Sequence, residues 1–125
     1  MEIGAHRGEH RLFLIFAASL RDEGFVLQDS LLAGSGEGFV ERDLLRGYFF
    51  EDGAGSFDGA PVSSEEASLV RGRLGVEPGR FSALLVGKDG TVKYRFDEPV
   101  GPVEVYALID AMPLRQREMR EGGGG

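Results

Sequence analysis

The chain has no cysteine among its 125 residues. Disulfide bridges, thiolate metal sites, iron–sulfur clusters and cysteine nucleophiles all require a thiol, so none of them can form within this chain. Thiol redox chemistry is excluded with them.

Positive charge and long apolar runs are also scarce. Fourteen basic residues stand against 21 acidic ones, which gives a formal net charge of −7, whereas proteins that bind polyanions carry a surplus of Lys and Arg. The longest apolar run, residues 12–18, is far below the ~20 residues that span a bilayer. We therefore expect no nucleic acid partner and no membrane insertion. The protein should be soluble, either cytoplasmic or exported after removal of a leader, and its oligomeric state stays open.

Apolar blocks and turn residues predict the element order β-α-β-α-β-β-α. The expected strands cover residues 11–18, 43–50, 81–86 and 91–96, the last two joined by a tight turn at Lys88-Asp89-Gly90. The expected helices cover residues 25–33, residues 63–74 and a stretch from 102 that should kink or restart at Pro113. The glycine-rich stretches 34–38 and 53–59 are expected to be loops.

This order favours an α/β fold, a thioredoxin-like three-layer sandwich with a mixed central sheet. The early βαβ unit needs parallel strands, whereas the closing hairpin is antiparallel. The domain is expected to cover residues 11–120, with a flexible segment at 1–10 and a disordered glycine tail at 121–125.

Two stretches resemble a known family: residues 87–93 (GKDGTVK) and residues 109–119 (IDAMPLRQREM). Gln28 fits the same pattern, as do Arg42 and Asp43, which are adjacent to each other. With these residues the chain resembles the peroxiredoxin-like domain of unknown function 4174, which also occurs in equarin and in sushi-repeat-containing proteins. The resemblance covers roughly residues 11–120 and implies a thioredoxin-like fold. It implies no catalytic residue.

The loop after the first strand is the first candidate site. Thioredoxin-like enzymes place their cysteines there, where a helix start lowers a thiol pKa; here the loop holds Arg21, Asp22 and Glu23, and Arg80 lies before the third strand. The leading hypothesis is a non-catalytic module that binds a protein or small ligand with these residues. The alternative is a cysteine-independent enzyme in which Arg21 contacts an anion while Asp22 and Glu23 act as acid/base groups.

A second set of charged residues is expected to form a structural network that locks the last helix to the sheet. Its members are Arg42, Asp43, Lys88, Asp89, Asp110, Arg115 and Glu118. Asp110 falls in an apolar helix, where an unpaired carboxylate would be costly, so it needs a partner such as an Arg. Arg42 with Asp43 and Arg115 with Glu118 are the expected pairs, and the alternative is that they clamp a ligand. A small charged site at the hairpin, including Lys93 and Arg95, is the alternative to a solvated edge strand.

Residues 6–10 match H-x-x-E-H, in which two histidines on one helix face bind zinc. Gly8 interrupts the motif and a strand follows at once, so we expect solvated rings and no metal site. The glycine-rich loops lack the spacing of dinucleotide or phosphate loops. No cofactor is expected.

Overall fold

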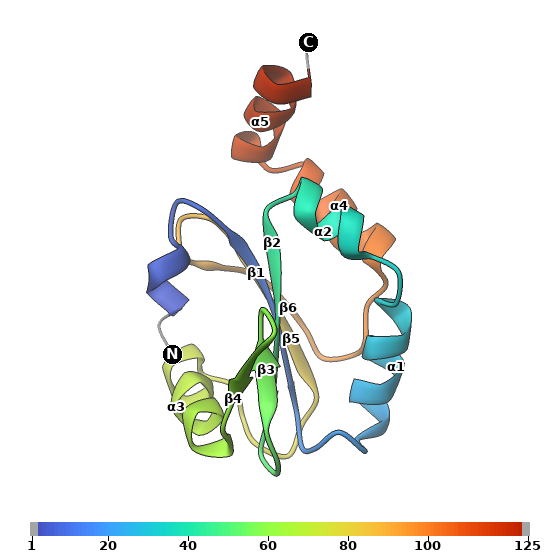
Figure 1. Cartoon of the computed structure of the whole chain (residues 1–125), viewed down its shortest axis with the longest axis vertical. Helices are drawn as coiled ribbons and strands as arrows, with labels where there is room; N and C mark the ends of the chain where they lie inside the picture. The colour runs from blue at the N-terminus through green and yellow to red at the C-terminus, as the bar shows by residue number, and fades with distance from the viewer. Residues whose placement is uncertain (1–2, 124–125) are drawn as a thin grey trace.

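A six-stranded mixed sheet in the order β4-β3-β2-β1-β5-β6 forms the middle layer of the computed structural model, which describes residues 3–123 (Figure 1). The strands are β1 (Arg11–Ala17), β2 (Leu44–Phe50), β3 (Gly55–Phe57), β4 (Ala60–Val62), β5 (Ser82–Val86) and β6 (Val92–Phe96). β1 pairs in parallel with β2 and antiparallel with β5. The sheet is therefore mixed, with β6 and β4 at its edges.

Helices cover both faces of the sheet. They are the 3-10 helix η1 (Ile3–His6) and the α-helices α1 (Glu23–Leu31), α2 (Gly36–Glu41), α3 (Ser64–Leu74), α4 (Pro102–Asp110) and α5 (Pro113–Gly123). α3 lies on one face, whereas α1, α2 and α4 lie on the other, and α5 projects past one end of the sheet (Figure 1).

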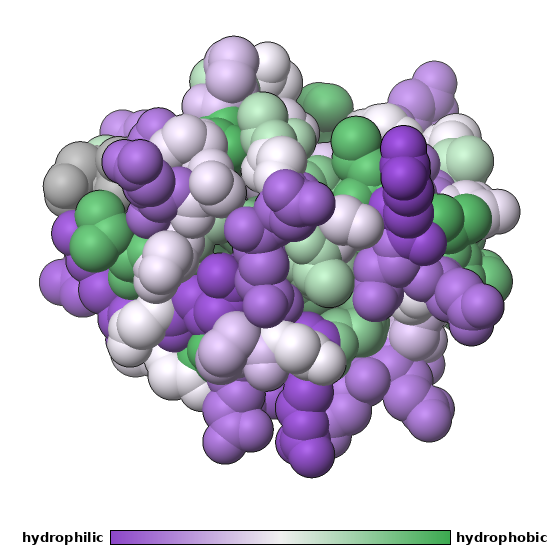
Figure 2. Space-filling view, turned by 90° about the horizontal axis from the view of Figure 1, so that it is seen from below, coloured by the Kyte–Doolittle hydropathy of each residue, from purple (hydrophilic) through white to green (hydrophobic). Residues whose placement is uncertain are grey.

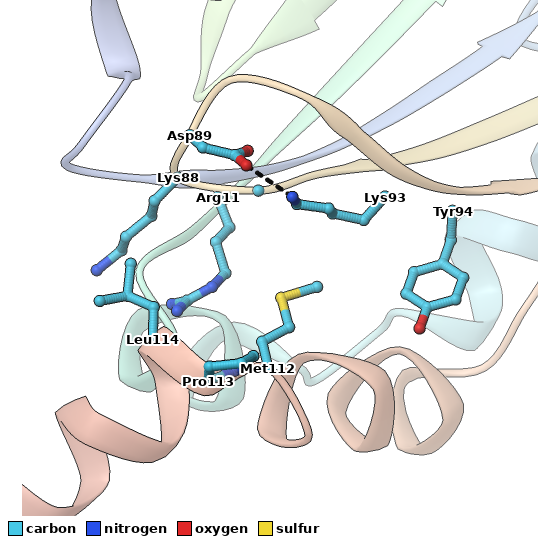
Figure 3. Close-up of a pocket in the computed structure, with 9 residues that line it drawn as sticks. Arg11, Lys88, Asp89, Lys93, Tyr94, Met112, Pro113 and Leu114 are labelled. Atoms are coloured by element: carbon cyan, nitrogen blue, oxygen red, sulfur yellow. Dashed lines mark hydrogen bonds and ion pairs between the residues drawn. The ribbon is translucent and has the colours of Figure 1, made fainter.

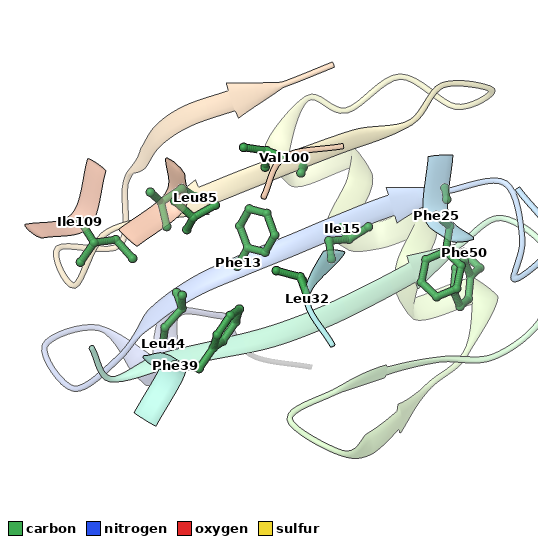
Figure 4. Packing of buried hydrophobic residues seen from close by; sticks show 13 residues of the cluster. Phe13, Ile15, Phe25, Leu32, Phe39, Leu44, Phe50, Leu85, Val100 and Ile109 are labelled. Carbon is green, nitrogen blue, oxygen red and sulfur yellow. The ribbon is translucent and has the colours of Figure 1, made fainter. Parts of the chain in front are cut away.

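Alternate residues of β1 pack into two separate hydrophobic cores. Phe13 and Ile15 pack with residues of α1, α2 and α4 (Figure 4), while Leu14 and Phe16 pack with residues of α3. Every residue of β1 is buried. Because helices cover both faces of this strand, none of its side chains faces water, and this explains the unbroken apolar run in the sequence.

Several local expectations are confirmed. Ser63 caps α3, since its hydroxyl accepts the Glu66 N–H at 3.1 Å, and Gly75 ends that helix with a positive φ of 67°. α4 ends at Asp110 and α5 begins at Pro113. Proline there cannot donate a backbone hydrogen bond, so one helix stops and a new one starts.

The two glycine-rich stretches are not simple loops as expected. The first contains the start of α2, and the second contains β3 and leads into β4. The buried side chains of Phe39, Phe57 and Val62 explain the difference. Their burial in the core outweighs the poor helix and strand propensity of the glycines around them.

The two ends of the chain also carry structure. η1 falls in the N-terminal segment, and the Gly8 N–H donates to the Lys88 carbonyl at 2.6 Å. α5 continues to Gly123, beyond residue 120 where the domain was expected to end. Residues 124–125 of the expected glycine tail lie outside the described residues. Between Ile3 and Gly123, the helices are all too short or too polar to cross a membrane.

Candidate functional site

The loop that follows β1, together with the first residue of α1, holds three of the expected site residues. Asp22 is the N-cap of α1: its Oδ2 accepts the Phe25 N–H at 3.1 Å. Arg21 and Glu23 are exposed beside it. Figure 2 views this end of the molecule and shows hydrophilic residues across its middle. Asp22 therefore stabilises the helix start, and any acid/base role would compete with that cap.

The segment before β5 lies against this loop. The ring of Phe81 is so near Gly24 that a Cβ at that glycine would lie 3.0 Å from it. Arg80 is exposed and lines a hollow of about 190 Å³ together with Glu77, Ser82 and Arg95. The two segments thus lie side by side at this end of the sheet.

A dense ion-pair network lies at the opposite end of β1. Asp110 accepts two hydrogen bonds from Arg42, at 3.0 Å from Nε and 2.9 Å from Nη2, and a third at 3.0 Å from Arg115 Nε. Burial alone raises the pKa of Asp110, but the hydrogen bonds from the two arginines lower it more, so its pKa lies below the usual value. The carboxylate thereby joins the end of α4 to the residue that follows α2 and to α5.

Glu118 forms the second centre of the network. Its Oε1 accepts from Arg11 Nη1 at 3.0 Å and its Oε2 from Lys88 Nζ at 2.6 Å. Lys88 Nζ also donates to Asp43 Oδ2 at 2.9 Å, and the same Arg11 Nη1 donates to the carbonyl of Arg42 at 2.9 Å. The pKa of Glu118 is raised by burial but lowered more by Lys88 and Arg11, and its net shift is downward.

The structure brings together six of the seven residues of the expected network and leaves Asp89 out. Asp89 instead accepts from Lys93 Nζ at 2.7 Å and from the Thr91 N–H, and these bonds hold its pKa below the usual value. The expected partners also differ, because Arg42 pairs with Asp110 rather than Asp43, and Arg115 pairs with Asp110 rather than Glu118. Most partners in the network come from other elements of the fold.

Arg11 and Glu41 were missed by the sequence reasoning. Arg11 opens an apolar strand, and its side chain is only 1% exposed. Glu41 pairs with Arg115 at 3.6 Å and with Arg42 at 3.3 Å. A single basic residue at the start of a strand that is otherwise wholly apolar was the available signal for Arg11, since a charge so placed needs partners at the sheet end.

A cavity of about 380 Å³ adjoins this network, between the β5–β6 turn and the junction of α4 with α5 (Figure 3). We call it the Arg11 cavity. It is lined by Arg11, Gly87, Lys88, Asp89, Lys93, Tyr94, Met112, Pro113 and Leu114. Arg11 Nη2 has no acceptor among the described residues, as is also true of Arg71 Nη2 and His10 Nδ1, but it is buried and so is not open to the cavity. The cavity thus combines apolar walls with three cationic side chains.

The histidines of the H-x-x-E-H motif are only partly solvated, whereas fully solvated rings were expected. Both are half-buried, with the His6 ring 5.4 Å from His10 and 5.2 Å from Phe57 between centroids. The packing against Phe57 of β3 explains the burial. Within residues 3–123 there is no group of three or more His, Asp or Glu side chains suited to a metal ion.

Comparison with solved structures identifies the fold. The reduced 2-Cys peroxiredoxin of Plasmodium vivax superposes with a TM-score of 0.68 at 14% sequence identity, covering 91% of this chain and 83% of that one. Thioredoxin peroxidase I of Plasmodium yoelii gives 0.66 at 15% identity, covering 96% and 80%. The fold is therefore the expected thioredoxin-like α/β sandwich, and at such low identity the likeness concerns the fold alone.

Sequence comparison places the chain in a family. Coiled-coil domain-containing protein 80 of Danio rerio is 32% identical over an alignment of 131 residues, gaps included, which covers 90% of this chain. The chain spans only 15% of the length of that relative. The model of the family described as Domain of unknown function (DUF4174) matches residues 2–118. This chain is a cysteine-free, thioredoxin-like member of the DUF4174 family.

Proposed function

We propose that this domain is a non-catalytic binding module that takes its ligand in the Arg11 cavity. The observation that carries the proposal is the cavity itself, which lies between the β5–β6 turn and the α4–α5 junction and combines apolar walls with cationic side chains.

The cavity also has the size and composition of a ligand site. Its volume of about 380 Å³ falls within the usual ~300–1,000 Å³ range of small-molecule pockets. Tyr94, Met112 and Leu114 supply apolar surface, while Lys88 and Lys93 supply ammonium groups held in place by Glu118 and Asp89. Polar groups fixed by their own partners favour binding, because little conformational entropy is lost when a ligand arrives.

A non-catalytic role is supported by the other end of the sheet. The loop after β1 has no thiol, and its Asp22 carboxylate caps α1. The alternative is an enzyme that works without cysteine through Arg21, Asp22 and Glu23. A ligand held by those three residues and Arg80 would favour that alternative or a binding site at the loop.

Nuclear magnetic resonance with three small probes tests the proposal. Benzoate, benzyl alcohol and benzylamine, each at millimolar concentration, are titrated into the ¹⁵N-labelled full chain. At least one probe should shift the backbone amides of Gly87, Lys93 and Leu114. Shifts confined to residues 19–24 and 80–82, or no shifts at the cavity with any probe, would show that the cavity is not the binding site.

A cavity-filling variant provides the matched control. Met112→Trp places a bulky ring in the cavity and should abolish the shifts. Val103→Trp adds the same ring on the exposed surface of α4 and should leave them intact. Shifts that survive Met112→Trp in a folded protein would contradict binding in the Arg11 cavity.

A further inference from the structure

We infer that the ligand of the Arg11 cavity carries an uncharged aromatic ring, which packs on Tyr94 and Met112 beside the ammonium group of Lys93. This inference rests on the proposed function and specifies the chemistry of the same site.

The charges at the cavity cancel, which disfavours a charged ligand. Each cation of the lining lies within 3.0 Å of a carboxylate, so that three cations face three carboxylates: Arg11, Lys88 and Lys93 against Asp43, Asp89 and Glu118. The remaining nitrogen of the Arg11 guanidinium is buried and closed to the cavity. A ligand charge of either sign would lose hydration there without gaining an unpaired counter-ion.

The walls of the cavity favour an apolar group. Met112, Pro113 and Leu114 come from the α4–α5 junction, and Tyr94 comes from β6. Tyr94 is 42% exposed and Leu114 is 40% exposed, so a ligand would remove apolar surface from water. Figure 3 shows the Met112 thioether pointing into the space beside Lys93 and Tyr94. An uncharged apolar group therefore gains free energy here by burial.

The ammonium groups beside these walls favour an aromatic ring over a saturated one. A saturated group would displace water from Lys88 and Lys93 and return no electrostatic attraction, whereas the face of an aromatic ring attracts a cation. The Met112 sulfur and the Tyr94 ring add contacts that are also specific to aromatic groups. All three interactions are open to a ligand without net charge.

The protein itself contains an ion-paired cation that also lies over a ring. Arg42 pairs with Asp110 at 2.9 Å, and its guanidinium carbon is 4.0 Å from the centroid of the Tyr106 ring. One cation can thus hold a carboxylate and a ring at the same time. The same combination is available to Lys93, which pairs with Asp89 and lines the cavity.

Amide-shift titrations of the ¹⁵N-labelled full chain with four matched ring compounds test the inference. Benzyl alcohol should bind at least about threefold more tightly than cyclohexylmethanol, benzoate or benzylamine. Cyclohexylmethanol is more apolar than benzyl alcohol, so a cavity that selects by hydrophobicity alone would reverse that order. Equal or tighter binding of any of the three would overturn the inference and leave cavity binding intact. Failure of all four to shift the cavity amides would instead overturn the proposed function.

Two variants of β6 locate the source of the aromatic preference. Lys93→Gln removes the ammonium group and Tyr94→Leu removes the aromatic wall, so each should reduce the preference for benzyl alcohol over cyclohexylmethanol about twofold to threefold. Arg95→Gln is the matched control, because Arg95 is on the same strand but donates to the Leu74 carbonyl outside the cavity. An unchanged preference in both Lys93→Gln and Tyr94→Leu would refute the inference.

A peptide arm distinguishes two sources of the same ring. A small aromatic compound and a phenylalanine side chain of a partner protein present the same group. A capped alanine tripeptide with phenylalanine at its centre should bind more tightly than benzyl alcohol if the ring arrives on a protein chain, and more weakly if it arrives on a small molecule. A peptide that shifts the cavity amides equally well with cyclohexylalanine in place of phenylalanine would contradict the aromatic assignment.

Discussion

Replacement of Glu118 by glutamine should destabilise the protein at neutral pH and leave its stability almost unchanged in acid. The side chain is 24% exposed and accepts hydrogen bonds from two buried cations, Arg11, which is 1% exposed, and Lys88, which is 10% exposed. Glutamine keeps the shape and one carbonyl oxygen but removes the negative charge. Both cations then lose their shared counter-ion.

The expected loss of stability is about 2 kcal/mol at pH 7. Hydrogen bonds to charged groups each contribute about 1.5–3 kcal/mol, and breaking a fully buried ion pair costs about 3–5 kcal/mol. The value here is smaller because water reaches Glu118, the glutamine carbonyl still accepts one hydrogen bond, and Lys88 keeps Asp43 as a partner. Urea denaturation followed by circular dichroism measures the difference.

The pH dependence separates the charge from mere shape. The pKa of Glu118 in the folded protein lies below its unfolded value of 4.5, because the hydrogen bonds from Lys88 and Arg11 outweigh the effect of burial. Its contribution is therefore complete above about pH 4.5 and is lost as the pH falls through the lower, folded-state pKa. In that pH range the difference in free energy of unfolding between wild type and Glu118→Gln should disappear.

A neighbouring glutamate serves as the control for this experiment. Glu121→Gln removes the same charge from an exposed position on α5 and should change stability by less than about 0.5 kcal/mol. Equal effects of the two substitutions at pH 7, or a Glu118→Gln loss that persists in acid, would refute the reasoning.

Three further outcomes are expected. Gln28→Leu should lower the free energy of unfolding, measured by urea denaturation, by about 2–4 kcal/mol. Gln28 is fully buried, and its amide both donates to the Val100 carbonyl at 2.8 Å and accepts the Val100 N–H at 2.9 Å. A variant as stable as the wild type would show that these backbone groups find other partners. Truncation after Ala107 should abolish the cooperative thermal transition seen by circular dichroism, because it removes buried Ile109 and the network residues Asp110 and Glu118; a cooperatively melting fragment would contradict this. The purified protein should reduce neither insulin disulfides nor peroxide, since it has no cysteine, and turnover above a protein-free control would disprove that.

The sequence by itself determined the features that depend on local chemistry. The apolar run of β1 implied cover on both faces, the Asp-Gly pair placed the β5–β6 turn, and Ser63 with Gly75 marked the ends of α3. The absence of cysteine excluded thiol chemistry. Each of these signals acts within a few residues, through backbone preference, capping or side-chain periodicity, so it could be read without knowing the fold.

The composition of the candidate site was decided by the tertiary structure. Arg11 meets Glu118 across 107 residues and the Arg42 carbonyl across 31, and no local pattern specifies which helix ends will meet at one end of a sheet. Asp89, by contrast, stays out of the network because it has a local partner, Lys93, on the same hairpin. Periodicity reports which residues share a face of one element. The long-range charge partners and the cavity arise only where several elements come together, and there the balance between desolvation and pairing selects the partners.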